Sequence, residues 1–124
     1  MVKTTKLRHK LVGYYTQGSR PNFARLKEYH DWKDHVRART PQALHDHVRK
    51  YGLGAAAPGV RVDVVCYFEN GTHNDPENVR KSIVDAVFPS DKWVYGFHLH
   101  PCYDREHPRV EVTVSYEVPA PETP

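Results

Sequence analysis

The stretch "NDPENVRKSIVDAV", residues 74–87, places acidic and basic side chains at spacings that could serve chemistry. Asp75 and Glu77 open it, and Lys81 and Asp85 follow Glu77 at four-residue steps. Carboxylate oxygens are ligands that Mg²⁺ accepts. A lysine beside them could stabilise negative charge that develops on a phosphoryl group. The residue types therefore suggest a metal site that acts on phosphate.

The same residues are also what a well-capped helix needs. Asp at the N-cap, Pro at the first helical position and Glu in the first turn suit the free N–H groups and the positive end of the helix dipole. Glu77 and Lys81 could be an ordinary surface pair four residues apart. At about 100° per residue, Val79 and Ile83 fall on an apolar half and the charged residues on a polar half. The spacing predicts a two-faced helix over residues 75–87.

A further acid follows the predicted helix. Asp91 lies in "PSDKWVYG", where the chain must turn to enter the next strand. A strand that leaves beside the helix could bring Asp91 back toward Asp75 and Glu77. Three carboxylates there could share one Mg²⁺, which prefers oxygen ligands and keeps several waters. Helix capping and metal binding both remain open at this point.

Hydrophobic periodicity elsewhere predicts a mixture of strands and helices. The predicted order is strand, helix, helix, strand, helix, strand, strand, over residues 6–16, 22–39, 40–51, 60–69, 75–87, 92–99 and 110–118. Thr40 before Pro41 is a good helix start, and Gly52 is a good helix end. We expect an α/β (α+β) fold, a mixed β-sheet packed with about three helices. One domain should span residues 1–118, with a disordered tail over residues 119–124.

Two patterns identify the core. Tyr29, Trp32 and Val36 recur at three- and four-residue steps, which gives the second predicted element one apolar stripe. In residues 60–69, apolar side chains alternate with mostly polar ones, which predicts a strand with one buried face. Cys66 falls on that face. Two cysteines do not make a disulfide framework in a chain of this length, so both are expected as reduced thiols.

The composition is that of one globular domain: 124 residues, 39% hydrophobic and 27% charged. No apolar run approaches the ~20 residues of a membrane span, and the basic start lacks a signal-peptide pattern, so we expect a cytoplasmic protein with no membrane partner. Residues 1–50 hold twelve Lys and Arg against four Asp and Glu, and residues 51–124 hold six against eleven. A basic half suits a phosphate backbone and an acidic half a divalent cation. Solvated helix faces and scattered surface acids explain the same charges.

The stretch from residue 75 to 94 resembles the RusA-type Holliday junction resolvases, a family common in phages and prophages. That family's signature opens with Asp-x-Asp-Asn, has a Lys three residues after the Asn, then Asp-Ala-Leu, and then an Asp-Asp pair before a strand. The matching positions are Asp75, Asn78, Lys81, Asp85-Ala86 and Asp91, with Glu77 at the second Asp. "YHDWKDHVRAR" also looks like the family's first helix. The similarity runs over roughly residues 11–118.

The resemblance implies metal-dependent hydrolysis of phosphodiesters. The implied ligands of Mg²⁺, with Mn²⁺ as a substitute, are Asp75, Glu77 and Asp91. The ion would polarise the scissile phosphate and activate a water. Lys81 would stabilise developing charge or orient the water, and Asn78 would position a ligand or phosphate. Asp85 would orient Lys81, or it is a surface acid in a salt bridge.

The implied substrate is branched DNA, above all the four-way junction, resolved by paired symmetric nicks. The basic residues expected to contact DNA are Arg20, Arg25, Lys33, Arg37, Arg39 and Arg80. Such binding should weaken steeply with salt. Because a junction has near two-fold symmetry, the resemblance implies a homodimer with two sites. It also implies the cytoplasm of a bacterial or phage-infected cell.

An alternative is a catalytically weak or inactive branched-DNA-binding protein on the same fold. Three departures from the family pattern allow it. Glu77 is longer than the usual Asp, Ser90 replaces the first residue of the Asp-Asp pair, and the connection to Asp91 is shorter than usual. The length of that connection controls whether Asp91 reaches the other acids.

A second alternative, from a different class, is a small zinc-stabilised interaction domain. "HLHPC" puts His98, His100 and Cys102 at alternate positions, with His107 nearby, and these are zinc-ligand types. They would share a face if the strand continued, but Pro101 is expected to end it. Otherwise they are surface or interface residues. The remaining helical histidines are expected to face solvent or DNA: His30, His35, His45 and His47.

Overall fold

The computed structural model describes residues 2–12, 23–51, 59–92 and 94–118. The predicted tail over residues 119–124 lies outside the described residues, as does Gly52. The chain order of the elements is β1 Val2–His9, α1 Phe23–Arg39, α2 Gln42–Tyr51, β2 Val60–Phe68, α3 Pro76–Val87, β3 Val94–Tyr95, β4 Cys102–Tyr103 and β5 Arg109–Glu117. This mixed sheet with three helices confirms the predicted α+β fold. No helix in these ranges is long and apolar enough to cross a membrane.

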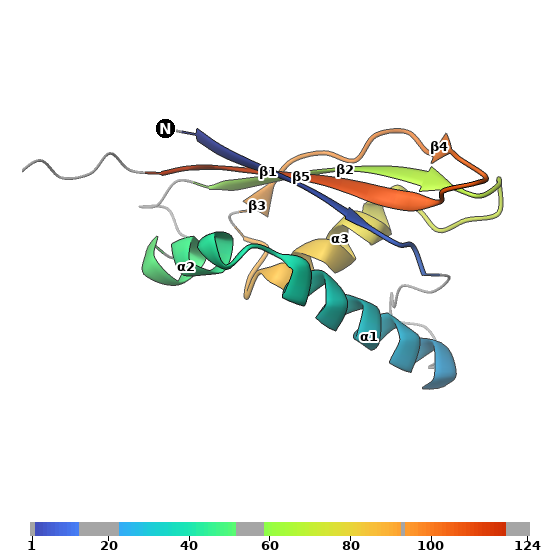
Figure 1. Ribbon diagram of the computed structural model, residues 1–124, viewed down its shortest axis with the longest axis horizontal. Helices are drawn as coiled ribbons and strands as arrows, with labels where there is room; N and C mark the ends of the chain where they lie inside the picture. The colour runs from blue at the N-terminus through green and yellow to red at the C-terminus, as the bar shows by residue number, and fades with distance from the viewer. Residues whose placement is uncertain (1, 13–22, 52–58, 93, 119–124) are drawn as a thin grey trace, which may run out of the picture.

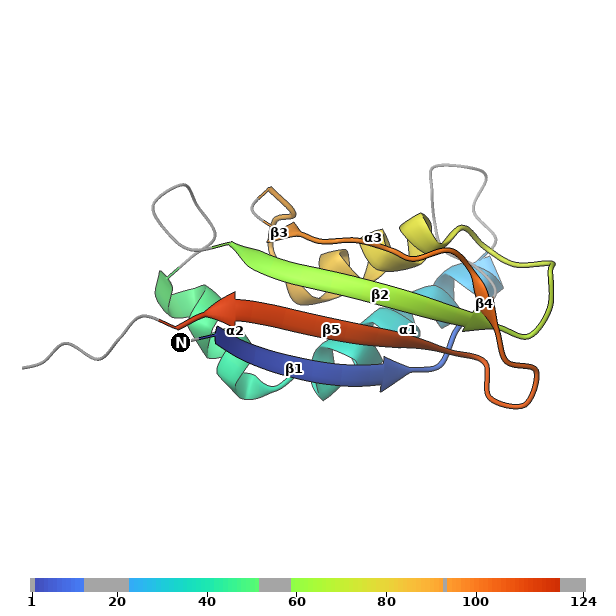
Figure 2. The same cartoon turned by 90° about the horizontal axis from the view of Figure 1, so that it is seen from above.

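The sheet has the strand order β1–β5–β2–β3, and β4 also pairs with β2. β5 is antiparallel to both β1 and β2, whereas β3 and β4 run parallel to β2. All three helices lie on one side of the sheet, which Figure 1 shows edge-on and Figure 2 shows from above. The opposite face of the sheet carries no helix among the described residues. We call it the open face.

The core lies between the sheet and the helices. Val60, Val62, Val64, Cys66 and Phe68 are all buried, as the alternation predicts. The predicted stripe of α1 is buried as well: Tyr29, Trp32 and Val36. Polar tips of the buried aromatics find partners, because an unpaired buried donor is costly. The Tyr29 hydroxyl donates to Ser82 Oγ at 3.0 Å, and Trp32 Nε1 donates to the Lys10 carbonyl at 2.7 Å.

The first strand lies earlier than predicted. The sequence favoured residues 6–16, of which residues 13–16 lie outside the described residues, and β1 covers Val2–His9 and pairs with β5 from Val2 opposite Glu117 to His9 opposite Val110. β1 forms one edge of the sheet, so only Leu7, half-buried, and His9, buried, pack toward the helices near its end. The first residues of β1 are mostly polar and show no alternation of apolar and polar side chains. The sequence therefore did not predict them as part of a strand.

The junction between α1 and α2 differs from the predicted capping. Thr40 is buried, and its hydroxyl donates to the Val36 carbonyl at 2.9 Å, one turn back in α1. It therefore finishes α1. The carbonyl of Pro41 accepts from the Leu44 N–H at 3.0 Å and so begins α2. His47 was expected at the surface, but it is buried, with its ring centroid 4.5 Å from that of Tyr116.

The predicted strand over residues 92–99 is broken. Among the described residues of this edge, only β3, a single bridge between His98 and Val64, and β4 pair with β2. We call residues 94–103 the edge segment. Gly96 has φ 135°, and a Cβ there would lie 2.1 Å from the Val62 carbonyl oxygen. Glycine is therefore required where the edge segment crosses closest to β2.

The register of the edge segment also shifts. His98 lies opposite Val64, but Cys102 lies opposite Tyr67, so one extra residue has entered between them. Because paired residues of a parallel ladder point to the same face, His98 follows the buried face of β2 and Cys102 follows the open face. His98 and Cys102 therefore do not share a face, and residues 99–101 are not in a strand, in line with the break expected at Pro101.

Gly96→Ala should destabilise the protein by roughly 2 kcal/mol or more, since the new methyl group clashes with backbone and the φ value disfavours any side chain. Equilibrium urea unfolding measures the change. Gly71→Ala is the matched control, because nothing lies within 4 Å of a Cβ placed there. It should stay within about 0.5 kcal/mol of the parent chain. Equal effects of the two substitutions would contradict the close approach at Gly96.

His9 is a buried histidine with an unusual environment. Its side chain is 3% exposed, and neither ring nitrogen has a hydrogen-bond partner among the described residues. Burial first, then the charges of Arg39 and His35, lowers the pKa of His9 from 6.5 to about 4. The folded protein therefore holds this ring neutral, whereas the unfolded chain protonates it near pH 6.5.

This difference predicts a loss of stability in acid. Above pH 6.5 neutral His9 makes its full contribution to the free energy of unfolding. This contribution declines as the pH falls from 6.5 toward 4 and is lost below pH 4. Its total size is about 3 kcal/mol at most. Urea unfolding near pH 7 and pH 5 should show a smaller decline for His9→Leu than for the parent chain. His100→Leu, at an exposed site, serves as control. An undiminished decline in His9→Leu would assign the acid sensitivity to another group.

Candidate functional site

The acidic start of α3 is held in place by its own backbone. Asp75 is the N-cap residue, and its Oδ1 accepts from the Glu77 N–H at 2.9 Å. Its carbonyl accepts from the Asn78 and Val79 N–H groups at 3.0 and 3.2 Å. Pro76 fixes the first helical position. The predicted capping is therefore present, and it orients the Asp75 carboxylate at the exposed end of the helix.

Glu77 and Lys81 form an ion pair on the next turn. Lys81 Nζ lies 3.4 Å from Glu77 Oε1, and both side chains are about half exposed, at 55% and 52%. Such a solvated pair contributes little to stability, so both groups remain available to a charged ligand. Asp75 and Glu77 each use one oxygen in the contacts described, and their other oxygens make no hydrogen bond or ion pair within the described residues.

A cleft of about 590 Å³ opens beside this helix start. The residues that line it come from the loop before α3 and from the edge segment: His73, Asn74, Asp75, Pro76, His98, Leu99, His100 and Pro101. One of the two candidate acids thus faces a cavity large enough for a small ligand or a phosphate group. The histidines of "HLHPC", His98 and His100, line the same cleft as Asp75.

His73 is the residue that sequence reasoning missed. Its ring stacks on Phe68, with centroids 3.9 Å apart and planes within 7°. Its two nitrogens contact the Asn74 carbonyl at 2.7 Å and the Tyr103 hydroxyl at 2.9 Å. These contacts tie the loop before α3 to β2 and β4. Nothing in the local sequence signals them, because they depend on the pairing of β4 with β2.

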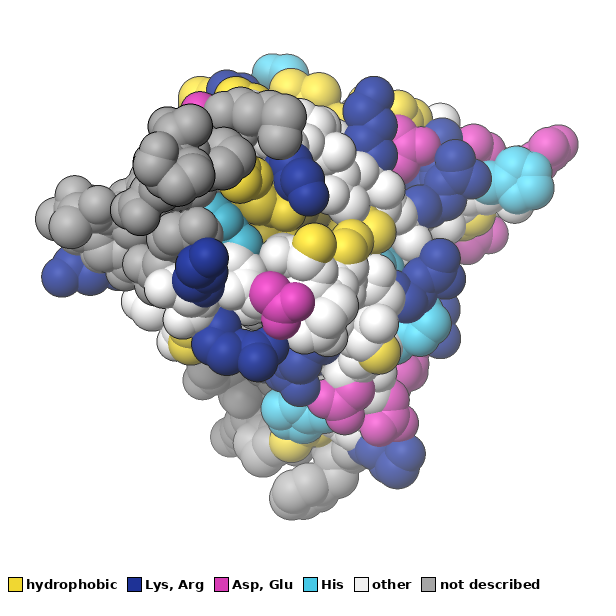
Figure 3. All heavy atoms as spheres, turned by 60° about the vertical axis from the view of Figure 1, so that its left-hand side comes forward, with side chains coloured by type: hydrophobic (Ala, Val, Ile, Leu, Met, Phe, Trp, Pro, Cys, Tyr) yellow, Lys and Arg dark blue, Asp and Glu magenta, His cyan; other side chains and the backbone are white. Residues whose placement is uncertain are grey.

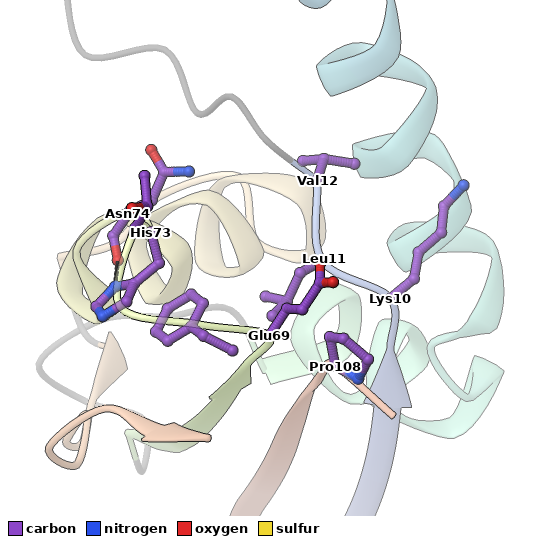
Figure 4. A pocket seen from close by; sticks show the side chains of 9 residues that line it. Lys10, Leu11, Val12, Glu69, His73, Asn74 and Pro108 are labelled. Carbon is purple, nitrogen blue, oxygen red and sulfur yellow. Dashed lines mark hydrogen bonds between the residues drawn. The ribbon is translucent and has the colours of Figure 1, made fainter. Parts of the chain in front are cut away.

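A second hollow, of about 690 Å³, is also lined by His73 and Asn74 (Figure 4). Lys10 and Val12 line it from the end of β1, and Glu69 and Pro108 from the turns beyond β2 and before β5. Figure 4 shows His73 and Asn74 together at one side of this hollow and Lys10 at the other. The loop before α3 therefore lines two hollows.

Asp91 does not join the other two acids. It lies beyond the opposite end of α3, a 12-residue helix that is about 18 Å long. The four steps from Val87 to Asp91 span about 14 Å even when fully extended. The chain also turns at Asp91, whose carbonyl accepts from the Val94 N–H at 3.1 Å. The expected convergence of Asp91 with Asp75 and Glu77 is therefore absent, because the connection is too short to return along the helix.

Asp85 also stands apart from its expected partner. It is exposed, and the structure pairs Lys81 with Glu77, one turn before, with no ion pair from Lys81 to Asp85. Asn78 is half-buried, and its carbonyl accepts from Ser82 Oγ at 2.9 Å. The roles expected for these two side chains remain predictions.

The basic residues expected to contact DNA are divided among several environments. Arg37 is half exposed, and its Nε donates to the Ala86 carbonyl at 2.7 Å, near the negative end of the α3 dipole. Lys33 Nζ lies 5.2 Å from the centre of the Tyr29 ring, and Arg39 is exposed. Arg20 and the side chain of Arg25 lie outside the described residues. Figure 3 shows Lys and Arg side chains interspersed with Asp and Glu on the face seen there.

Arg80 is turned inward. Its Nε donates to the Val62 carbonyl at 2.9 Å, and its Nη2 is buried without a partner among the described residues. Burial lowers the pKa of Arg80, and the charges of Asp63 and Glu77 partly oppose that shift. The guanidinium therefore joins α3 to β2. A role in DNA contact stays a prediction that this placement does not favour.

The zinc alternative gains no support from the placement of its residues. Within the described ranges, no three His, Cys, Asp or Glu side chains are grouped so that they could hold a metal ion. His98 and His100 are exposed at the cleft, while Cys102 has shifted register. Both cysteines are free, as expected. Burial first, then Cys102 and Asp75, raises the pKa of the Cys66 thiol to about 12, so Cys66 stays protonated.

Comparison with the models of known protein families finds no match to this chain, and no curated protein matches it at a significant level. The resemblance to RusA-type resolvases therefore rests on the motif from residue 75 to 94 and stays a prediction.

The capping geometry predicts how substitutions at Asp75 affect stability. Asp75→Asn should leave the unfolding midpoint nearly unchanged, because Asn caps helices as well as Asp does, whereas Asp75→Ala should lose about 1 kcal/mol. Glu77→Gln should change stability by less than about 0.5 kcal/mol, since its pair with Lys81 is solvated. Thermal and urea unfolding measure all three. A large loss in Asp75→Asn would show that the carboxylate charge itself holds the fold.

Proposed function

We propose that this chain is a structure-specific endonuclease that acts on branched DNA, with the start of α3 as its site. One observation carries the proposal. Asp75, Glu77 and Lys81 occupy the exposed first two turns of one helix, and Asp75 lines a 590 Å³ cleft. Two carboxylates and an ammonium group at an open helix start suit the binding of a divalent cation and a phosphodiester. The sequence resemblance supplies the substrate class.

Mg²⁺ is the group that the resemblance implies, and the donor chemistry at the start of α3 fits it in part. Mg²⁺ is commonly held by one or two carboxylates, with water and substrate phosphate completing its coordination. Asp75 and Glu77 offer two such carboxylates, and Asp91 does not reach them. When bound, the ion would polarise the phosphate and acidify a water.

The side chains at the start of α3 have different roles in this proposal. The cap bond from the Glu77 N–H orients the Asp75 carboxylate without reliance on a neighbouring side chain. Lys81 would exchange its solvated contact with Glu77 for a phosphate oxygen when DNA binds. Asn78 would contact the phosphate next to it. Basic side chains would hold the DNA backbone, and a homodimer would present two such sites to the two symmetric strands of a junction.

The second candidate function is branched-DNA binding without efficient cleavage. The position of Asp91, beyond the far end of α3, favours it, because the site then has one carboxylate fewer than the resemblance implies. Under this function the acids at the start of α3 serve helix capping, and the two carboxylates would not be needed for binding DNA.

A cleavage assay on end-labelled four-way junction and matched linear duplex, each with Mg²⁺ and with EDTA, separates the two functions. We expect paired nicks in the junction only, and only with Mg²⁺. Asp75→Asn should abolish cutting and leave both junction affinity and stability unchanged, since it keeps the helix cap. Asp91→Asn is the matched control and should cut nearly as well as the parent chain.

The outcomes are distinct. Junction binding without nicks would favour the binding protein. An Asp75→Asn variant that cuts at the parent rate would show that the catalytic site does not lie at the start of α3. A large loss of cutting in Asp91→Asn would show that Asp91 reaches the other acids when DNA is bound.

A further inference from the structure

The buried ring of His9 lies at the last position of an edge strand. Among the described residues, β1 pairs only with β5, and Figure 2 shows it along one border of the sheet. Elements that are paired on one side open locally more readily than the centre of a fold. The buried polar side chain without a hydrogen-bond partner among the described residues is therefore placed where the sheet can open at its border.

The surroundings of this ring disfavour a proton. From α1, the His35 ring has its centroid 6.5 Å from that of His9, and the charges of Arg39 and His35 both oppose a positive charge on His9. The cavity that His9 lines is otherwise bordered by apolar side chains from the three helices, β1, β2 and β5, and by Thr40, whose hydroxyl donates to the Val36 carbonyl. None of these described neighbours is a carboxylate that could balance a charge on the ring.

The chain on both sides of His9 closes over α1. We call residues 7–12 the β1 end. Leu7 and Leu11 are half-buried and Val12 is buried, and the Lys10 carbonyl accepts from Trp32 Nε1 at 2.7 Å. Residues 10–12 also line the hollow of about 690 Å³ beside the loop before α3. Movement of the β1 end would therefore expose the Trp32 indole and change one wall of that hollow.

We propose that the β1 end is an acid-sensitive switch, in which proton uptake by His9 releases residues 7–12 from β5 and α1 while the rest of the fold stays closed. The released ring enters water, which solvates its charge and separates it from Arg39 and His35. The switch has a closed state near neutral pH and an open state that acid populates. It uses none of the acids at the start of α3 and is independent of the proposed endonuclease activity.

The size of the response follows from the two states of His9. In the closed state the pKa of His9 is lowered from 6.5 to about 4, first by burial and then by Arg39 and His35, whereas in the open state the ring lies in water. The ratio of open to closed forms should therefore rise about twentyfold between pH 7 and pH 5. Opening of the β1 end exposes few apolar side chains, whereas global unfolding exposes the whole core, so the smaller opening occurs first.

The test is hydrogen exchange of the full chain, followed by NMR at pH 7 and pH 5 in several low concentrations of urea. The Trp32 indole N–H reports on the β1 end, and the backbone N–H of Ile83, buried in α3, reports on the core. After correction for the exchange rate of an unprotected group, exchange at Trp32 should rise about twentyfold from pH 7 to pH 5. It should depend weakly on urea, whereas exchange at Ile83 should depend steeply on urea, because only global unfolding exposes a large surface.

His9→Leu should abolish the acid-induced rise at Trp32. Arg39→Gln should reduce it, because one charge that opposes the proton in the closed state is gone, and this exposed site keeps the test decisive if His9→Leu does not fold. His100→Leu, an exposed histidine near the opposite edge of the sheet, is the matched control and should behave like the parent chain.

Equal urea dependence of exchange at Trp32 and Ile83 would overturn the proposal and assign the acid response to global unfolding. A rise in His9→Leu as large as in the parent chain would overturn it too, as would an unchanged rise in Arg39→Gln. Because the measurement uses neither DNA nor Mg²⁺, its outcome is separate from that of the proposed endonuclease.

Discussion

The carbonyl of Val62 is the point on which the arrangement depends. It accepts the Nε–H of Arg80 at 2.9 Å, which fixes α3 against β2. The edge segment also approaches it so closely that only glycine fits at position 96. Three elements thus meet at one backbone group of a fully buried residue. The polar half of α3 faces solvent because the apolar half, with Val79, Ile83 and Ala86, is buried in the core.

The start of α3 combines two demands that are usually separate. A helix N-terminus stabilises negative charge, so acids placed there strengthen the fold. The same acids, exposed and beside a cleft, can also bind a cation. Since Asn replaces Asp as a cap without loss but not as a charged ligand, the structure lets the two roles be tested apart. The contacts of His73 add to this by holding the preceding loop to β2 and β4.

Sequence periodicity predicted the buried elements well and the edges poorly. β2, β5, α1 and α3 bury one continuous face each, and the repeats of Val60 to Phe68 and of Tyr29, Trp32 and Val36 report that burial directly. β1 and the edge segment pair on one side only, so their residues carry little alternation. The bonds that fix them depend on β5 and β2, which are remote in sequence. Pro101 and Gly96 are the local signals of the break, and the structure adds that Gly96 has a positive φ beside the Val62 carbonyl.

The candidate site also has a part that the local sequence determines and a part that depends on contacts remote in sequence. The local part, Asp75 to Lys81, lies on one helix and could be placed from spacing alone. The remote part, Asp91, could not, because its position depends on the path between α3 and β3. That path has too few residues to return along a helix of about 18 Å, and its turn at Asp91 carries the chain directly to β3 at the start of β2. His98 and His100 of the edge segment come to the cleft beside Asp75 instead. Among the described residues no third carboxylate joins Asp75 and Glu77, so a cation held there would take its further ligands from water or from the substrate, and the choice between the two proposed functions depends on this constraint.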